Sequence, residues 1–154
     1  MNAQISTLSR LSLILCCFSL ITAMGCNGNS SGSKIPDSIE GYEKTTSGLF
    51  IKDIEVGQGI EVQEGDMVGI NETLTYRDGT VLFSTDKNGQ PVKFTVGAGQ
   101  AIDGIDEGVR GMKIGGIRSL VIPPSLSKRT EYPDNIHPDS ILVNTVSLVL
   151  LQRP

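Results

Sequence analysis

A glycine-rich stretch that ends in a double proline constrains this chain more than any other feature. Residues 96–124 read VGAGQAIDGIDEGVRGMKIGGIRSLVIPP. Four apolar residues in it recur at three- and four-residue spacing and predict a helix over residues 101–112, with one buried face made of Ile102, Ile105, Val109 and Met112. Glycine is a poor helix former, so a helix containing Gly104 and Gly108 must be stabilised by packing against other elements.

The chain on either side of this helix is predicted to consist of strands and turns. Apolar alternation and β-branched runs predict six strands at residues 49–54, 68–76, 81–85, 92–96, 117–122 and 141–151. Asp78-Gly79 predicts a hairpin turn, because this pair accepts the positive φ angles that such turns need. Residues 125–138 are predicted to form a long loop.

The first 25 residues have the composition of an export signal and not of a folded domain. Residues 1–10 are polar with one basic side chain, and residues 11–23 are almost unbrokenly apolar. That apolar run is shorter than the ~20 residues that a membrane-spanning helix needs. Gly25-Cys26 resembles a bacterial lipoprotein cleavage site, which predicts a lipoprotein attached to the membrane through Cys26. Plain secretion and a retained membrane anchor are the alternatives.

Cysteine placement supports lipid attachment. Cys16 and Cys17 lie in the predicted signal peptide, which leaves Cys26 alone in the mature chain. A free terminal thiol is reactive in an oxidising compartment, whereas a lipidated one is not. We therefore expect an exported, membrane-anchored protein of the periplasm or outer cell envelope, with a flexible tether at residues 26–46 and one domain at residues 47–153. We also expect a monomer, and the net charge of −4 disfavours a nucleic-acid partner.

The order of the glycines and prolines resembles the family of FKBP-type peptidyl-prolyl cis-trans isomerases over about residues 47–150. The positions that carry the resemblance are Ser47-Gly48-Leu49, Val56-Gly57-Gln58-Gly59, Asp78-Gly79-Thr80, Gln90-Pro91, Gly99-Gln100-Ala101-Ile102-Asp103-Gly104, Asp106-Glu107-Gly108, Gly111-Met112-Lys113, Gly115-Gly116, Arg118 and Ile122-Pro123-Pro124. The resemblance implies an α+β fold in which a curved antiparallel sheet wraps around one short helix. It also implies isomerisation of bonds preceding proline, with no cofactor and no metal.

The resemblance also locates a substrate pocket whose residues depart from the family pattern. The positions that correspond to the pocket are Glu72, Leu82, Phe83, Val92, Ala101, Ile102, Ile105, Lys128 and Asn144. The family's strand tyrosine is replaced by Glu72, its tryptophan floor by Ile105, and its loop tyrosine by Lys128. Ile102 keeps the position of the backbone N–H donor. A bulge could bring Phe83 into the place of a family phenylalanine, and Tyr132 could replace the loop tyrosine.

Glu72 is the least expected residue of this set. Period-two alternation places it on the same face as Ile70 and Leu74, where an unpaired carboxylate is costly. Lys128 is the candidate partner, and the alternative is a local twist that lets Glu72 reach water. A catalytic acid role is disfavoured because the isomerisation needs no proton transfer. His137, the single histidine, is expected to be exposed in a loop.

These observations predict a weakly active prolyl isomerase that acts on proline-containing exported polypeptides. Ile102, Ile105 and Phe83 still offer an apolar cleft for a proline ring. The alternative is a catalytically silent peptide-binding or chaperone module on the same scaffold. A structural spacer without a ligand is the third possibility.

Overall fold

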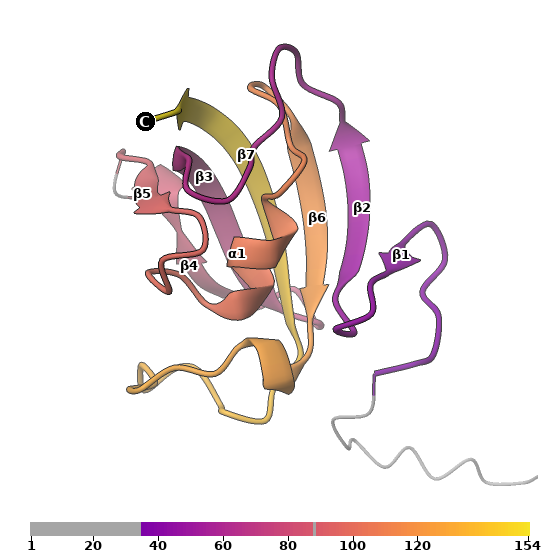
Figure 1. Cartoon of the computed structure of the whole chain (residues 1–154). Coiled ribbons are helices and arrows are strands. Elements are labelled where there is room, and N and C mark those ends of the chain that lie inside the picture. Colours follow the sequence, from indigo (N-terminus) through magenta and orange to yellow (C-terminus); the bar gives the residue numbers. More distant parts are fainter. Residues whose placement is uncertain (1–34, 88) are drawn as a thin grey trace, which may run out of the picture. The chain divides into compact units, whose positions relative to one another are not determined.

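The computed structural model describes residues 35–87 and 89–154 and is dominated by one antiparallel sheet (Figure 1). Its strands follow the order β1-β2-β6-β7-β3-β4, with β5 paired beside β3. The elements are β1 (Glu43–Lys44), β2 (Phe50–Glu55), β3 (Met67–Tyr76), β4 (Val81–Ser84), the 3-10 turn η1 (Thr85–Lys87), β5 (Val92–Thr95), α1 (Asp103–Gly108), β6 (Ile117–Ile122), the 3-10 turn η2 (Pro124–Leu126) and β7 (Leu142–Gln152).

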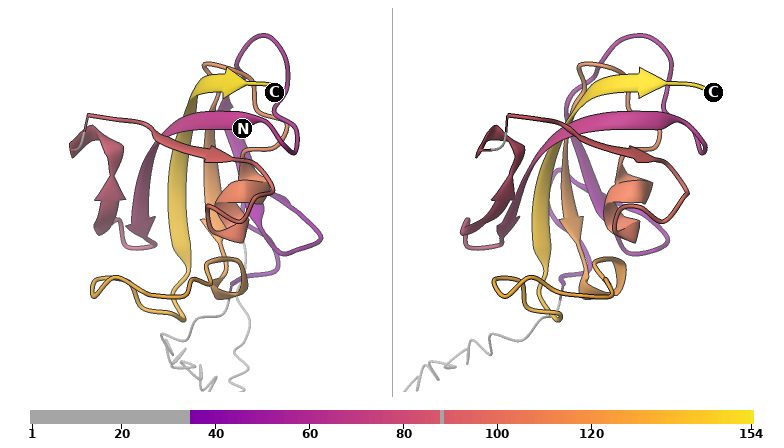
Figure 2. Two further views of the ribbon diagram at one scale, coloured as in Figure 1. Left: turned by 60° about the vertical axis from the view of Figure 1, so that its left-hand side comes forward. Right: turned by 90° about the vertical axis from the view of Figure 1, so that its left-hand side faces the viewer.

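The sheet curves around α1, as the two turned views show (Figure 2). Strand β3 organises the curve, because it pairs with β7 along its whole length, with β5 near its beginning and with β4 near its end. A bulge between Gly69 and Ile70 shifts the register with β7, and bulges increase the local twist of a strand. The predicted α+β fold, a curved antiparallel sheet around one short helix, is confirmed.

Helix α1 approaches β6 closely enough that only glycine fits at two positions. A Cβ atom on Gly104 would lie 2.5 Å from Ile122 Cγ2, and one on Gly108 would lie 2.4 Å from Leu120 Cδ1. Leu120 and Ile122 are fully buried, so neither side chain has free space into which to move. The glycines that weaken the isolated helix thus permit the packing that stabilises it.

The helix is shorter than the predicted span of residues 101–112. It covers Asp103–Gly108, and its chain then turns at Gly111, which has a φ of 76°. The predicted buried face is nevertheless right, because Ile105, Val109 and Met112 all belong to the main core cluster. Packing, and not helical periodicity over three turns, determines how these apolar residues are buried.

Arg118 ties the end of α1 to strand β2. Its Nη1 donates to the carbonyls of Gly108 (2.8 Å) and Arg110 (2.9 Å), and its Nε donates to Asp53 Oδ1 at 2.6 Å. Arg118 is 9% exposed, and arginine is rarely so buried unless its charge is paired. This one guanidinium satisfies the carbonyl of the last helical residue, Gly108, and the carbonyl of Arg110 in the turn that follows α1.

Part of the predicted tether is folded. Within residues 35–46, Ile35, Ile39 and Tyr42 pack against a second apolar cluster on the outer side of the sheet, and β1 pairs with β2. The prediction of a flexible tether is therefore wrong for residues 35–46. The predicted signal peptide, Cys26 and the remainder of the tether lie outside the described residues.

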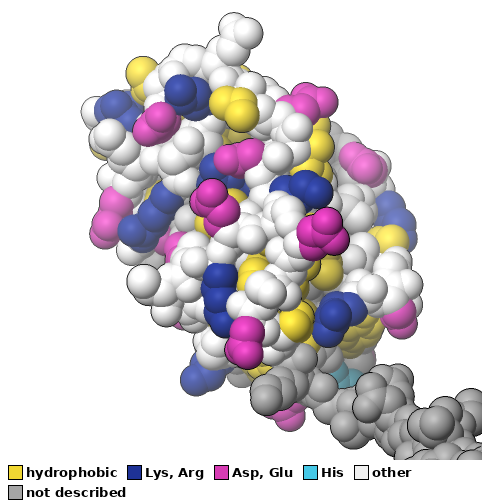
Figure 3. Space-filling model, turned by 90° about the vertical axis from the view of Figure 1, so that its right-hand side faces the viewer, with side chains coloured by type: hydrophobic (Ala, Val, Ile, Leu, Met, Phe, Trp, Pro, Cys, Tyr) yellow, Lys and Arg dark blue, Asp and Glu magenta, His cyan; other side chains and the backbone are white. Residues whose placement is uncertain are grey.

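The face that carries β2 shows acidic and basic side chains interspersed with apolar ones (Figure 3). No helix within residues 35–87 and 89–154 is long and apolar enough to span a membrane.

Candidate functional site

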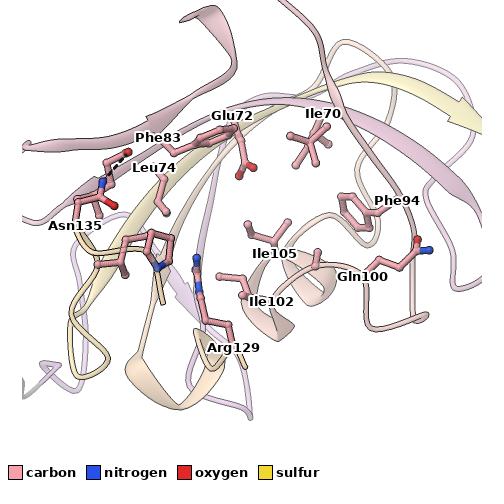
Figure 4. A pocket seen from close by; sticks show the side chains of 15 residues that line it. Ile70, Glu72, Leu74, Phe83, Phe94, Gln100, Ile102, Ile105, Arg129 and Asn135 are labelled. Atoms are coloured by element: carbon pink, nitrogen blue, oxygen red, sulfur yellow. Dashed lines mark hydrogen bonds between the residues drawn. The ribbon is translucent and has the colours of Figure 1, made fainter. Parts of the chain in front are cut away.

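A cleft of about 390 Å3 opens between the concave side of β3, the beginning of α1 and the loop that joins β6 to β7 (Figure 4). Most of its walls are apolar. The apolar lining consists of Ile70, Leu74, Leu82, Phe83, Val92, Phe94, Ala101, Ile102, Ile105, Pro133 and Ile136, and the polar lining of Glu72, Gln100, Arg129 and Asn135. Such a mainly apolar cleft with a few polar groups is typical of a ligand site.

The structure brings most of the predicted pocket residues together. Those that line the cleft are Glu72, Leu82, Phe83, Val92, Ala101, Ile102 and Ile105. Asn144 does not line it but lies behind Glu72, fully buried. Lys128 is exposed and is not part of the lining, so its predicted place in the pocket is wrong. Its neighbour Arg129 occupies that wall, because the loop turns one side chain outward and the next inward.

Glu72 is the single acidic group of the cleft lining, and its carboxylate points into the cavity (Figure 4). The residue is 9% exposed, so the predicted place of Glu72 on the buried, apolar face of β3 is right, and its carboxylate reaches the open cleft. Thr85 fixes its backbone, since the Glu72 N–H donates to Thr85 Oγ1 at 3.0 Å. The carboxylate is therefore held in place by strand and turn.

The predicted partner of Glu72 is replaced by two other side chains. The Asn144 Nδ2 group, and not Lys128, donates a hydrogen bond to Glu72 Oε2. Burial raises the pKa of the Glu72 carboxyl above its ordinary value of 4.5, while the Asn144 hydrogen bond and the Arg129 charge lower it to a smaller extent. A carboxyl whose pKa is perturbed by desolvation in a cleft is a candidate functional group.

Arg129 faces Glu72 from the opposite wall of the cleft (Figure 4). Its guanidinium lies over the Tyr132 ring, 5.8 Å from the ring centre, and its Nε donates to the Ser127 carbonyl at 3.4 Å. Tyr132 itself packs against the core cluster and does not line the cleft, so it does not replace the family's loop tyrosine. Instead it supports Arg129.

The hydrogen-bonding and charge-pairing capacity of Asn144 and Glu72 is not fully used. Asn144 is fully buried, and its Oδ1 atom has no hydrogen-bond partner in the described part of the chain. Glu72 and Arg129 likewise form no ion pair within residues 35–87 and 89–154. Buried polar groups are normally hydrogen-bonded, and exceptions call for an explanation.

A bulge in β4 shapes the rim of the cleft. Leu74 pairs with Phe83 and Thr75 pairs with Val81, which leaves Leu82 as the extra residue. Both Leu82 and Phe83 consequently line the cleft. The bulge considered for Phe83 is thus present.

The long loop that closes the cleft is tied to the hairpin formed by β3 and β4. The Tyr76 hydroxyl donates to the Asn135 carbonyl at 2.9 Å and accepts from the His137 N–H at 3.0 Å. The Asn135 side chain in turn donates to the Leu82 carbonyl at 3.1 Å (dashed in Figure 4). His137 is exposed, as expected, and contributes its backbone alone. Sequence reasoning missed these anchors because no periodicity places residues within a loop.

Other lining residues were also missed, and two of them, Phe94 and Gln100, have a signal in the sequence. Phe94 follows Val92 by two positions on a predicted strand, so it shares the same face, and Gln100 follows the strand in the motif that carries the family resemblance. Gln100 accepts a hydrogen bond from the Thr95 N–H at 2.8 Å. Ile136 lies in the loop, where its burial has no such signal.

Ile102 provides a backbone donor at the cleft wall. It precedes α1, and its carbonyl accepts from the Ile105 and Asp106 N–H groups at 2.9 Å and 3.0 Å. Its own N–H has no acceptor among the hydrogen bonds of the structurally described chain. The Ile102 N–H can therefore donate to a carbonyl of a bound segment without breaking an internal hydrogen bond.

The sequence pattern of the family described as FKBP-type peptidyl-prolyl cis-trans isomerase matches residues 58–149. FK506-binding protein 2 of Yarrowia lipolytica is 40% identical over 94 residues, which cover 60% of this chain and 65% of that protein. The chloroplastic photosynthetic NDH subunit of lumenal location 4 of Arabidopsis thaliana is 36% identical over 99 residues, 60% of this chain and 46% of that protein.

Two solved structures share the fold. FkpA from Escherichia coli superimposes with a TM-score of 0.67 at 31% identity, over 75% of this chain and 54% of that one. AtFKBP13 gives a TM-score of 0.63 at 29% identity, over 71% of this chain and 97% of that one. The matched region spans less than two thirds of the length of the curated relatives named above, so it corresponds to one part of those proteins.

Proposed function

Because the chain belongs to the family of FKBP-type peptidyl-prolyl cis-trans isomerases, we propose that its cleft binds proline-containing segments of exported polypeptides and isomerises them slowly. The observation that carries this proposal is the apolar cleft beside the free Ile102 N–H. A proline ring fits the apolar walls, and a backbone carbonyl of the bound segment outside the rotating bond accepts from the Ile102 N–H.

The chemistry demands little of the side chains. The barrier to rotation about the bond before proline is about 18–20 kcal/mol and arises from amide resonance. A site lowers this barrier by excluding water from the amide and by holding the twisted form through shape and fixed dipoles. No nucleophile is needed for such a step.

The composition of the walls supports slow turnover. Phe83 and Phe94 are the two aromatic residues in the lining, and the other apolar members are aliphatic or proline. Aromatic contacts contribute about 0.5–1.5 kcal/mol each beyond the area they bury. A cleft with few of them holds the proline ring less tightly in the transition state.

Exchange NMR on the full chain with a blocked proline tetrapeptide tests this proposal, because it detects slow turnover. We expect an isomerisation rate above that of the peptide alone. Ile102→Pro removes the N–H while keeping the backbone, since Ile102 has a φ of −67°, which proline adopts. It should lower kcat/KM by about tenfold or more, whereas the control Ile102→Val, which keeps the N–H, should stay within about threefold.

A catalytically silent binding module is the second candidate, and the carboxylate of Glu72 in the cleft favours it. A charged group beside the twisting amide adds a polar wall where desolvation is required. The substitution Glu72→Tyr, which adds an aromatic ring and keeps Phe83 in the cleft, separates the two candidates. Activity that rises sharply from zero would identify a silent native cleft, while a modest rise from a measurable rate would identify an enzyme.

We also propose that the protein is exported and held at a membrane by lipid on Cys26. The sequence around Gly25-Cys26 and the loss of both other cysteines with the leader support this assignment. Metabolic labelling with a tagged fatty acid should mark the chain and fail to mark Cys26→Ser. Equal labelling of both forms would contradict it.

A further inference from the structure

Glu72 is a buried carboxylate that forms no ion pair in the described part of the chain, although the guanidinium of Arg129 faces it from the opposite wall of the cleft. It is 9% exposed, receives one hydrogen bond from Asn144 and forms no ion pair there. An acidic group taken out of water needs a counter-charge or several hydrogen bonds. A positive charge on a bound segment would complete this site.

The walls around this carboxylate indicate what carries that positive charge. Ile70, Leu74 and Phe83 lie around Glu72 in the cleft (Figure 4). A small hydrated cation would leave these apolar walls without contacts. A lysine side chain fits both the apolar walls and the carboxylate, because its four-carbon stem packs on apolar surface while its ammonium pairs with an acid.

Arg129 sets the polarity of the cleft from the other wall. It is more exposed than Glu72, so its charge is better screened by water and repels an incoming ammonium weakly. Its guanidinium donates hydrogen bonds, which suits a backbone carbonyl of a bound segment. An acidic side chain of a bound segment would lie close to the Glu72 carboxylate and would be repelled by it.

We propose that the cleft selects proline-containing segments that carry a lysine next to the proline, with the ammonium paired to Glu72. This inference rests on the proposed binding of prolyl segments and adds the class of segment that is preferred. Segments with an uncharged side chain of the same length bind more weakly, and segments with an acidic one bind weakest.

Calorimetric titration of the full chain with matched, blocked tetrapeptides tests the preference. The residue next to proline is lysine, norleucine or glutamate, in separate peptides with this residue before or after the proline. We expect the lysine peptide to bind about tenfold more tightly than the norleucine peptide at neutral pH in at least one of the two positions. In Glu72→Gln, which keeps the size of the side chain, this preference should fall to about one.

Glu40→Gln is the matched control, because it removes the same charge from an exposed residue of the N-terminal segment. It should leave the lysine preference within about twofold of the native value, since one distant exposed charge is largely screened. A preference that vanishes equally in Glu40→Gln would mean long-range attraction to an acidic protein and would overturn the inference. A preference that persists in Glu72→Gln would do the same.

Two further outcomes separate this inference from the proposed function. Equal binding of the lysine and norleucine peptides overturns the lysine preference and leaves prolyl binding intact. A peptide with lysine beside alanine that binds as tightly as the lysine–proline peptide overturns prolyl recognition and leaves Glu72 as the lysine site. Binding of none of the peptides overturns both.

Discussion

The two sides of helix α1 follow different physical rules. Where α1 faces β6, contacts are so close that Gly104 and Gly108 have no room for a Cβ atom, and the charge of Arg118 is fully paired. Where the beginning of α1 faces the cleft, there is open space, and the carboxylate of Glu72 forms no ion pair among the described residues. Features that hold the fold together are thus separate from those available for recognition.

On the side of α1 that faces β6, we expect the largest loss of stability when the charge of Arg118, which bridges α1 and β2, is removed. Arg118→Met should lower the free energy of unfolding by about 2–4 kcal/mol, because it leaves the carbonyls of Gly108 and Arg110 without their donor, whereas the half-exposed Asp53 can be hydrated. Urea denaturation measures this. The control Lys113→Met removes a cation whose ion pair with Glu61, at 3.6 Å, joins two partly exposed side chains, and it should cost about 1 kcal/mol or less. Equal losses in the two variants would contradict the assigned role of Arg118.

Filling the close contact between α1 and β6 should have a smaller effect. Gly104→Ala places a methyl group 2.5 Å from Ile122 Cγ2 and should cost about 1–3 kcal/mol, although alanine is the better helix former. Asp103→Ala, at the exposed neighbouring position, changes the same helix without this collision and should cost less. Thermal unfolding of both variants gives the comparison. A Gly104→Ala protein as stable as the native one would show that β6 shifts to make room for the methyl group.

On the cleft side of α1, the comparison can be tested through the pKa of Glu72, which burial raises. The folded state therefore binds this proton more tightly than the unfolded chain, so the stability it contributes is present below the unfolded pKa and is lost as pH rises through the folded pKa. Glu72→Gln keeps a neutral side chain at every pH. It should unfold with a free energy up to about 1 kcal/mol higher at pH 7, with the gain disappearing in acid.

The measurement is a series of urea titrations between pH 3 and pH 8 on both proteins. A constant difference across this range would mean that Glu72 does not titrate differently in the two states. A Glu72→Gln variant that is less stable at pH 7 would mean that the Asn144 interaction outweighs the cost of burial.

The smallest expected effect concerns an acid that is fully paired, in contrast to Glu72. Arg153 donates to both oxygens of Asp66 at 2.9 Å and 2.8 Å, and this hydrogen bonding, with the Gln63 N–H, lowers the pKa of Asp66 to about 2. The stabilisation is present above the unfolded pKa and is lost as pH falls through the folded value. In Arg153→Met the pKa of Asp66 should rise toward 3.8, as carboxyl NMR titration would show, and an unchanged value would refute the role of Arg153.

Sequence reasoning succeeded where spacing and glycine chemistry fix the structure. Period-two alternation placed Glu72 on the buried face of β3, and the glycines of α1 indicated a helix that needs packing. The pocket residues on strands and at the start of the helix followed from the family resemblance, and seven of them line the cleft.

It failed where neither periodicity nor turn chemistry applies. In the loop after η2, nothing in the sequence distinguishes the exposed Lys128 from the inward Arg129. In residues 35–46, polar neighbours obscure the apolar residues Ile35, Ile39 and Tyr42, which are spaced by four and three positions. The partner of Glu72 was missed because Asn144 lies 72 residues away and is brought close by strand pairing alone.

The hydrogen bonds of Tyr76 to the loop above the cleft have a kinetic consequence. Because Tyr76 and Asn135 already hold this loop on the hairpin, a bound segment does not have to order it. If a segment binds here, the entropy loss of ordering falls mainly on that segment, and no opening of the rim has to precede its association. Replacing Tyr76 with phenylalanine would transfer part of that ordering cost to the binding step.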